Sequence, residues 1–183
     1  MNEGITPDQL KAMFHHKTGK SLPLVFYDDI ISESKNADDL FNGVPYMVVY
    51  YPQFQRDNLN VGHYVALCLN KAKDKPQISY YDPLAYGIDQ YKQFSPQRKE
   101  LYDEEFNSLV WWLLQYRKEG VLIEDNHHQH QSRKPDVATC GRHAIIRCIY
   151  HMLDNNNYNT FMRKAFGHGL LDEPVYNKTS KWR

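Results

Sequence analysis

Runs of apolar residues predict a β-rich centre for this chain of 183 residues. Residues 46–51, 63–69 and 77–81 form three short, mostly apolar runs of the length expected for buried strands. A shorter run at residues 24–27 precedes them. The segment 52–62 is long and polar for a hairpin loop, which suggests that it does more than join two strands.

Helical spacing predicts the first and the longest helices. Thr6 and Pro7 have the character of the cap and the first residue of a short helix that ends near residue 14. Residues 97–119 place their apolar side chains on one face and predict the longest helix, and residues 141–153 predict another. These helices flank the β-rich centre on both sides along the chain.

The order of the elements predicts the fold class. Residues 121–131 lie between two predicted helices and favour a further strand, and residues 160–166 favour a short helix. This order is typical of an α+β domain in which helices pack on a mixed or mostly antiparallel sheet. At this length we expect a single domain, residues 1–183.

The composition suits a folded protein and argues against several classes. Hydrophobic residues make up 42% of the chain, and 22 Lys and Arg balance 22 Asp and Glu. A neutral chain is unlike a protein whose main task is to coat nucleic acid or an acidic membrane. No apolar run is long enough to span a bilayer, and residues 1–14 lack the layout of a signal peptide. We therefore expect no membrane partner and no secretion.

The three cysteines, Cys68, Cys140 and Cys148, make an odd number without a Cys-x-x-Cys pair. This pattern argues against a disulfide framework or a Cys-rich zinc site and fits a reducing, intracellular setting. Cys68 lies in a strand run and Cys148 on the apolar face of a helix, so we interpret both as packing residues. Cys140 differs because it precedes Gly141 at the start of that helix.

The helix start gives Cys140 the environment of a nucleophile. Unpaired backbone N–H groups and the helix dipole stabilise a thiolate there. Gly141 has no side chain, so a substrate backbone can lie close to the sulfur. The alternative for Cys140 is a small buried hydrophobe, which is the usual role of a free cysteine.

A nucleophilic cysteine needs a base, and the base needs a group that orients it. His63 begins one predicted strand and Asp82 ends the next, so their side chains can meet at one rim of the sheet. Taken singly, His63 suits a surface position and Asp82 the start of an Asp-Pro turn. Together with Cys140 they make up the groups that a thiol hydrolase requires.

The segment 126–131, Asn-His-His-Gln-His-Gln, supplies two candidates for an oxyanion-stabilising amide, Gln129 and Gln131. In a strand both would point to the same face, so their spacing does not choose between them. The three histidines of the segment also suggest a metal site. However, no carboxylate or Cys pair stands at ligand spacing, so we expect no metal there.

The order of these groups resembles that of the adenain-like cysteine proteases, which belong to the SUMO-protease-like clan. It is most similar to the maturation proteases of adenoviruses, virophages and related large DNA viruses. The resemblance rests on Gly62-His63-Tyr64, on Tyr81-Asp82-Pro83-Leu84, and on Gln131 followed by Thr139-Cys140-Gly141-Arg142-His143.

The resemblance implies an α+β protease fold with Cys140 as the nucleophile on a central helix. It further implies His63 as the general base, Asp82 as its orienting group and Gln131 as the oxyanion donor. The spacing from Gln131 to Cys140 exceeds that of the adenovirus enzymes, which leaves Gln129 open as an alternative.

The resemblance also implies a substrate class. Tyr64 stands where the family often has Trp. Together with Gly141 it would favour a narrow cleft, and hence small residues such as Gly at the cleavage point. The implied substrates are viral capsid or scaffold precursor proteins, cut by a monomer in the virion and in the infected cell. No cofactor is required for the chemistry. The resemblance allows activation by a peptide or by DNA, and residues 127–134 form a locally basic strip.

Three alternative functions stay open at this point. The first is an isopeptidase that removes a ubiquitin-like protein, which is an activity of the same clan. The second is an acetyltransferase that uses the same three residues. The third is a non-catalytic binding protein that retains the protease fold.

Overall fold

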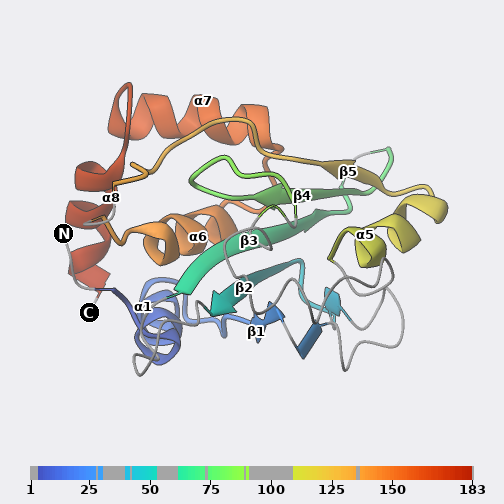
Figure 1. Cartoon of the computed structure of the whole chain (residues 1–183), viewed down its shortest axis with the longest axis horizontal. Helices are drawn as coiled ribbons and strands as arrows, with labels where there is room; N and C mark the ends of the chain where they lie inside the picture. The colour runs from blue at the N-terminus through green and yellow to red at the C-terminus, as the bar shows by residue number, and fades with distance from the viewer. Residues whose placement is uncertain are drawn as a thin grey trace.

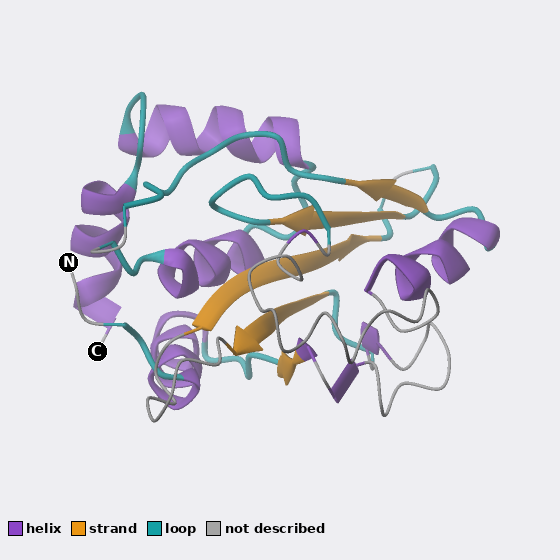
Figure 2. Cartoon of the chain, in the orientation of Figure 1, coloured by secondary structure: helices purple, strands orange, loops and turns teal. Residues whose placement is uncertain are grey.

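The computed structural model describes residues 4–27, 29–30, 40–41, 43–52, 62–72, 74–88, 90, 109–134 and 137–182. Within them a mixed sheet has helices against both faces (Figure 1 and Figure 2). The elements in chain order are α1 (Pro7–Thr18), β1 (Leu24–Phe26), β2 (Tyr46–Pro52), β3 (Gly62–Asn70), β4 (Gln77–Tyr81), α5 (Leu109–Lys118), β5 (Leu122–Glu124), α6 (Cys140–Ile149), α7 (Asn155–Phe166), α8 (Asp172–Thr179) and the 3-10 turn η2 (Ser180–Trp182).

The sheet has five strands in the order β1-β2-β3-β4-β5. β3 pairs antiparallel with β2 and with β4, whereas β1 and β5 lie parallel to their neighbours at the two edges. The register places Tyr51 opposite His63 and Tyr81 opposite Ala66. The predicted α+β class with a mixed sheet is confirmed.

The central strands are apolar throughout because both faces of the sheet are buried. Alternate residues of β2 and β3 belong to two separate cores. Val48 and Ala66 join the core that includes α1, α6, α7 and α8. Val49 and Leu67 join the core that includes α5. The sheet is therefore a middle layer between α6 and α5, and α6 lies behind β3 in Figure 1.

α1 begins as the sequence predicts. The Thr6 side chain accepts a bond from the Gln9 N–H, and the Gln9 side chain accepts one from the Thr6 N–H at 2.9 Å, which completes a capping box. The helix continues to Thr18, past its predicted end near residue 14. The prediction ends too early because the last turn is polar and lacks the apolar spacing that indicates a helix. Gly19, with φ of 68°, ends it in the left-handed conformation.

The predicted strand 121–131 is mostly wrong. Only Leu122–Glu124 form a strand, β5, and residues 125–131 are irregular. The N–H groups of His130 and Gln131 both donate to the carbonyl oxygen of Pro83, at 2.8 and 2.9 Å, instead of pairing with a strand. The segment therefore crosses the turn that follows β4.

The other helices differ from prediction mainly at their ends. α5 covers the described part of the predicted helix 97–119, whose first residues lie outside the described ones, as does most of the loop 52–62. α7 begins before the predicted residue 160 because the Asp154 side chain accepts a bond from the Asn157 N–H at 2.8 Å. The sequence does not predict α8, whose charged residues and proline hide its apolar positions. None of the described helices is long and apolar enough to cross a bilayer.

α6 ends at Ile149, short of its predicted end, and the side chain of Arg147 accounts for this. Arg147 is 0% exposed. Its guanidinium donates to the carbonyl oxygens of Tyr150, at 3.0 Å, and Leu153, at 2.7 Å, and lies 4.9 Å from the ring centre of Tyr158. One buried cation thus fixes the chain reversal after α6 and joins it to α7.

Arg147→Ala is expected to lower the free energy of unfolding by about 3 kcal/mol or more, because two carbonyl groups lose a charged donor. Arg163→Ala, at an exposed position of α7, should change it by about 0.5 kcal/mol or less. Urea unfolding followed by circular dichroism measures both changes. Equal losses in the two variants would contradict this role of Arg147.

Candidate active site

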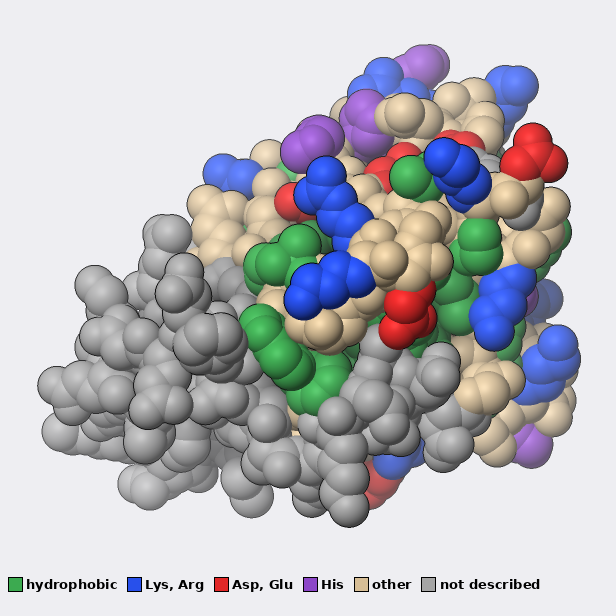
Figure 3. Space-filling model, turned by 90° about the vertical axis from the view of Figure 1, so that its right-hand side faces the viewer, with side chains coloured by type: hydrophobic (Ala, Val, Ile, Leu, Met, Phe, Trp, Pro, Cys, Tyr) green, Lys and Arg blue, Asp and Glu red, His purple; other side chains and the backbone are tan. Residues whose placement is uncertain are grey.

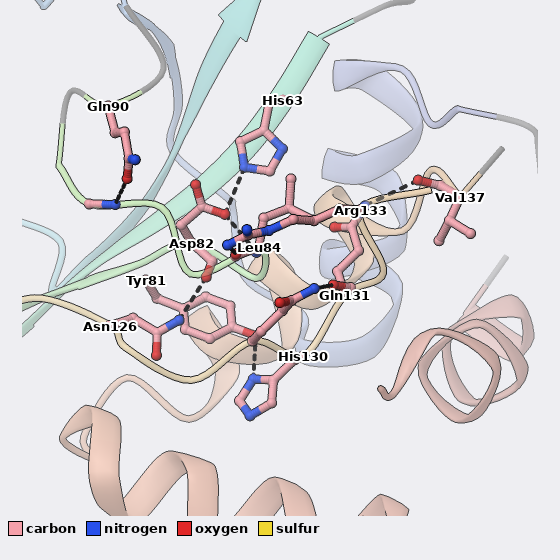
Figure 4. Close-up of polar contacts among 12 residues, drawn as sticks. His63, Tyr81, Asp82, Leu84, Gln90, Asn126, His130, Gln131, Arg133 and Val137 are labelled. Carbon is pink, nitrogen blue, oxygen red and sulfur yellow. Dashed lines mark hydrogen bonds and ion pairs between the residues drawn. The ribbon is translucent and has the colours of Figure 1, made fainter. Parts of the chain in front are cut away.

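His63 is the second residue of β3 and lies at the rim of the sheet where β4 ends. Its ring is buried, and its Nε2 lies 2.9 Å from Oδ1 of Asp82. Asp82 directly follows Tyr81, the last residue of β4, so the antiparallel pairing of β3 with β4 brings the two side chains together (Figure 4). His63 and Asp82 therefore lie together at the rim of the sheet, as the order of the strands predicts.

The Asp82 carboxylate is held by the turn that it begins. It is 0% exposed, and Oδ1 also accepts a bond from the Leu84 N–H at 2.7 Å. The buried Asn126 side chain donates to the Asp82 carbonyl oxygen at 2.6 Å, which fixes the backbone of the turn. Sequence reasoning misses Asn126, although the residue opens the segment that contains the two candidate glutamines.

Cys140 is the first residue of α6, with Thr139 at the cap, where the sequence places it. Its side chain is 8% exposed and lies close enough to His63 to contribute to the raised pKa of that histidine. Nε2 of the His63 ring is engaged by Asp82. His63 thus lies beside both Asp82 and Cys140, the arrangement that a Cys-His-Asp triad requires.

The electrostatics of the site act on His63. Burial lowers the pKa of His63, but the charge of Asp82, the hydrogen bond to Asp82 and the contact with Cys140 together raise it from 6.5 to about 10. At neutral pH His63 is therefore protonated, an imidazolium beside the Asp82 carboxylate and the side chain of Cys140. A cation at this place is the partner that a thiolate nucleophile uses in cysteine hydrolases.

The two candidate glutamines occupy different environments. Gln131 is 4% exposed, whereas Gln129 is exposed and donates to the Gln131 carbonyl oxygen at 2.8 Å. The Gln131 amide donates to the Val137 carbonyl oxygen at 3.1 Å, which leaves its second N–H for another acceptor. Because the segment is not a strand, the rule that alternate residues share a face does not apply to it. The burial favours Gln131, and its role as oxyanion donor stays a prediction.

Gly141 and Tyr64 pack against α1 and the residues before it. A Cβ at Gly141 would lie 2.7 Å from Ile5 Cγ2 and 3.1 Å from Tyr64 Cδ2. The Tyr64 hydroxyl donates to the Ile5 carbonyl oxygen at 2.8 Å, and its ring lies 4.6 Å from that of Tyr50. The missing side chain of Gly141 therefore has a packing cause that the sequence does not reveal. The predicted substrate contacts of both residues stay predictions.

The histidines near the site do not gather around a metal. His130 bonds to the Tyr81 hydroxyl at 2.9 Å and to the Asn159 side chain at 3.0 Å, and burial lowers its pKa to about 4. It is therefore neutral at physiological pH and links β4 to α7. Among the residues that the structure describes, no three His, Cys, Asp or Glu side chains converge as a metal ion would need.

Comparison with solved structures decides the fold. The ASFV pS273R protease matches with a TM-score of 0.57 and 12% sequence identity, over 98% of this chain and 67% of that chain. The chain has the fold of a SUMO-protease-like cysteine protease. At this identity the match establishes the fold of that protease and not its chemistry.

The remaining comparisons add little to this assignment. AvrA, solved with IP6 and CoA, matches over 93% of this chain and 59% of its own, with a TM-score of 0.39 and 12% identity. The Rickettsia bellii effector RickCE matches over 85% of this chain and 55% of its own, with a TM-score of 0.30 and 12% identity. Both TM-scores are too low to support an argument. No family model and no curated protein gives a significant match.

In this protease fold the raised pKa of His63 predicts how stability depends on pH. A histidine whose folded pKa exceeds its unfolded value stabilises the protein fully below pH 6.5 and loses that contribution as pH rises to about 10. The stability advantage of the wild type over His63→Gln should therefore shrink across this window, by at most about 1.4 kcal/mol per pH unit.

Urea unfolding of both proteins at several pH values from 6 to 10 measures this advantage. His127→Gln, at an exposed position, is the matched control and should show no such window. An advantage that stays constant over the window, or grows with pH, would contradict the predicted imidazolium.

Proposed function

We propose that this chain is a cysteine endopeptidase in which Cys140 is the nucleophile, His63 the general base and Asp82 its orienting group. The observation that carries the proposal is the buried His63–Asp82 hydrogen bond of 2.9 Å beside a cysteine that begins a helix. The fold supports it, because the ASFV pS273R protein, whose fold this chain shares, is a protease. A retained but inactive site would have no need for this alignment.

The reaction follows from the positions of the groups. The Cys140 thiolate, whose proton resides on the His63 imidazolium, forms a bond from its sulfur to the carbonyl carbon of the scissile peptide. The proton then passes to the leaving amine as the C–N bond breaks, which leaves an acyl-enzyme. Water attacks the thioester with His63 as base, and the acid product and the thiol are released. Asp82 holds the imidazole ring in place throughout.

The negative oxygen of each tetrahedral intermediate needs hydrogen-bond donors. The Thr139 side chain makes no capping bond at the start of α6, so it leaves the first N–H groups of the helix to other acceptors. The N–H of Cys140 and the second N–H of the Gln131 amide are the donors that we assign to the oxyanion. The dipole of α6 adds to their effect.

The proposed substrates are viral capsid or scaffold precursor proteins, cleaved after a small residue such as Gly. Support for a viral origin comes from the ASFV protease, whose fold this chain shares. We place the enzyme in the virion and the infected cell, as a monomer. On the face drawn in Figure 3, Lys and Arg side chains are interspersed with Asp and Glu, in keeping with the zero net charge. DNA or a peptide is proposed only as an activator, the role that the resemblance allows.

A glycine-ending peptide vinyl sulfone should label the wild-type protein at a single site, and Cys140→Ala should abolish the labelling without unfolding the protein. Cys68→Ala is the matched control: Cys68 is 0% exposed in the core, so its loss should leave the labelling intact. Intact-mass measurement and peptide mapping read out the adduct.

Different outcomes separate the alternative functions. Labelling that persists in Cys140→Ala would sink the proposal, and no labelling of the wild type would favour a non-catalytic binding protein. Labelling by a ubiquitin-like probe but not by the short peptide would favour the isopeptidase.

Gln131→Ala is expected to lower kcat on a glycine-containing peptide by about 100- to 1,000-fold, the usual effect of removing one oxyanion donor. Gln129→Ala should change kcat by less than about threefold, because that side chain is exposed. Steady-state kinetics on a fluorogenic peptide measures both. The reverse order of effects would assign the role to Gln129.

A further inference from the structure

Asp172, the first residue of α8, lies far along the chain from the proposed triad but bonds to two segments that carry site residues. Its Oδ2 accepts a bond from the Ser132 N–H at 2.8 Å, and its Oδ1 accepts one from the Thr139 hydroxyl. Ser132 follows Gln131, and Thr139 precedes Cys140. One carboxylate therefore joins the proposed oxyanion donor to the proposed nucleophile.

Because its hydroxyl bonds to Asp172, the Thr139 side chain does not cap α6. A threonine before a helix usually accepts a bond from an N–H group of the first turn. Here Thr139 makes no such bond, and its hydroxyl donates to Asp172 instead. The start of α6 is consequently positioned by α8 and not by its own cap.

The segment around Gln131 is held from two sides. On one side the N–H groups of His130 and Gln131 donate to the Pro83 carbonyl oxygen, next to Asp82. On the other side the Leu171 N–H donates to the His130 carbonyl oxygen at 2.7 Å, next to the bond between Ser132 and Asp172. Gln131 thus lies between the turn that carries the proposed orienting group and the start of α8.

α8 is itself fixed on α6, so it can serve as a support. Val175 is 0% exposed and belongs to the same core as α6. The Arg142 guanidinium donates to the Thr179 hydroxyl at 2.8 Å and lies 4.5 Å from the ring centre of Tyr176. Asp172 is therefore carried by a helix that has little freedom to move relative to the nucleophile.

Asp172 is suited to hold these donors as a carboxylate. Burial raises its pKa, but the contact with His143 and the bonds from Thr139 and Ser132 outweigh this and leave the pKa below its ordinary value. The distance of 3.8 Å from His143 Nε2 to Asp172 Oδ1 is too long for a hydrogen bond, so that contact is electrostatic. An ionised carboxylate bonds its donors more strongly than a neutral acid does.

We propose that Asp172 is a positioning residue, which aligns Gln131 and Cys140 on the same substrate carbonyl by bonding to Ser132 and Thr139. The inference rests on the proposed protease function and deepens it. Asp172 touches no reacting atom. Its effect is on the distance between the oxyanion donor and the nucleophile, where a shift of about 1 Å costs up to about 100-fold in rate.

Asp172→Asn keeps the size of the side chain and removes its charge. We expect kcat on a glycine-containing peptide to fall by about 10- to 100-fold, with KM within about threefold, because alignment matters most in the transition state. Alkylation of Cys140 by iodoacetamide needs no oxyanion donor and should stay within about threefold of wild type. Glu173→Gln is the matched control, since it makes the same charge change at an exposed neighbour and should leave kcat unchanged.

A second pair of variants tests the contact from its other end. Thr139→Val removes the hydroxyl at nearly constant volume and should lower kcat to a similar extent, whereas Thr139→Ser restores the donor and should recover most of the activity. This pair decides the matter if Asp172→Asn fails to fold, as judged by circular dichroism. Full activity of both Asp172→Asn and Thr139→Val would overturn the inference.

The activity of the wild type distinguishes a failure of this inference from a failure of the proposed function. If the wild type neither cleaves the peptide nor reacts with the vinyl sulfone, the protease function fails and the inference fails with it. If the wild type is active and Asp172→Asn is equally active, only the inference fails. If peptide turnover and alkylation fall by equal factors in Asp172→Asn, the residue acts on the thiol or on the fold, and the alignment role is overturned.

Discussion

The antiparallel pairing of β3 with β4 is the constraint on which the candidate site depends. It sets His63, near the start of one strand, beside Asp82, just after the end of the other. A slip of one residue would turn every side chain of a strand to the opposite face. Such a slip is costly here because both faces of the central strands are buried in separate cores. The packing of the whole sheet therefore fixes one hydrogen bond at its rim.

The sequence predicts those parts of the site whose signals are local. A histidine at the start of an apolar run, an Asp-Pro pair at the end of the next run and a Cys-Gly pair before a helical pattern all lie where they are expected. These positions follow from periodicity and from the rule that neighbouring antiparallel strands place opposite ends together. The α+β class follows from the same local patterns.

The parts that the sequence does not predict depend on irregular backbone and distant contacts. The predicted strand continues from its apolar start through residues 125–131, which are all polar. The N–H groups of His130 and Gln131 instead bond to the turn after β4. No local sequence pattern predicts that the side chain of Asn126 bonds to this turn. Nor does one predict that Arg147 ends α6 by bonding to the carbonyl groups that follow the helix. These roles are set by residues that come together only when the sheet and helices are assembled.

Gly141 illustrates how one residue can support two explanations. Its lack of a side chain suggests room for a substrate when the sequence alone is considered. The structure shows that a Cβ there would press against Ile5 and Leu10, so the close approach of α1 to α6 already requires glycine. Both explanations lead to the same residue, and only the surroundings distinguish them.

The start of α6 lacks the side-chain cap that a threonine ordinarily gives. Such a cap contributes about 1 kcal/mol to a helix, so the free protein forgoes this stabilisation at the very place where a substrate carbonyl is proposed to bind. A bound carbonyl oxygen would then act as the missing cap. The first turn of α6 would be most ordered in complexes, and ligands that end in an aldehyde or a carboxylate would stabilise the protein against heat by completing its own helix.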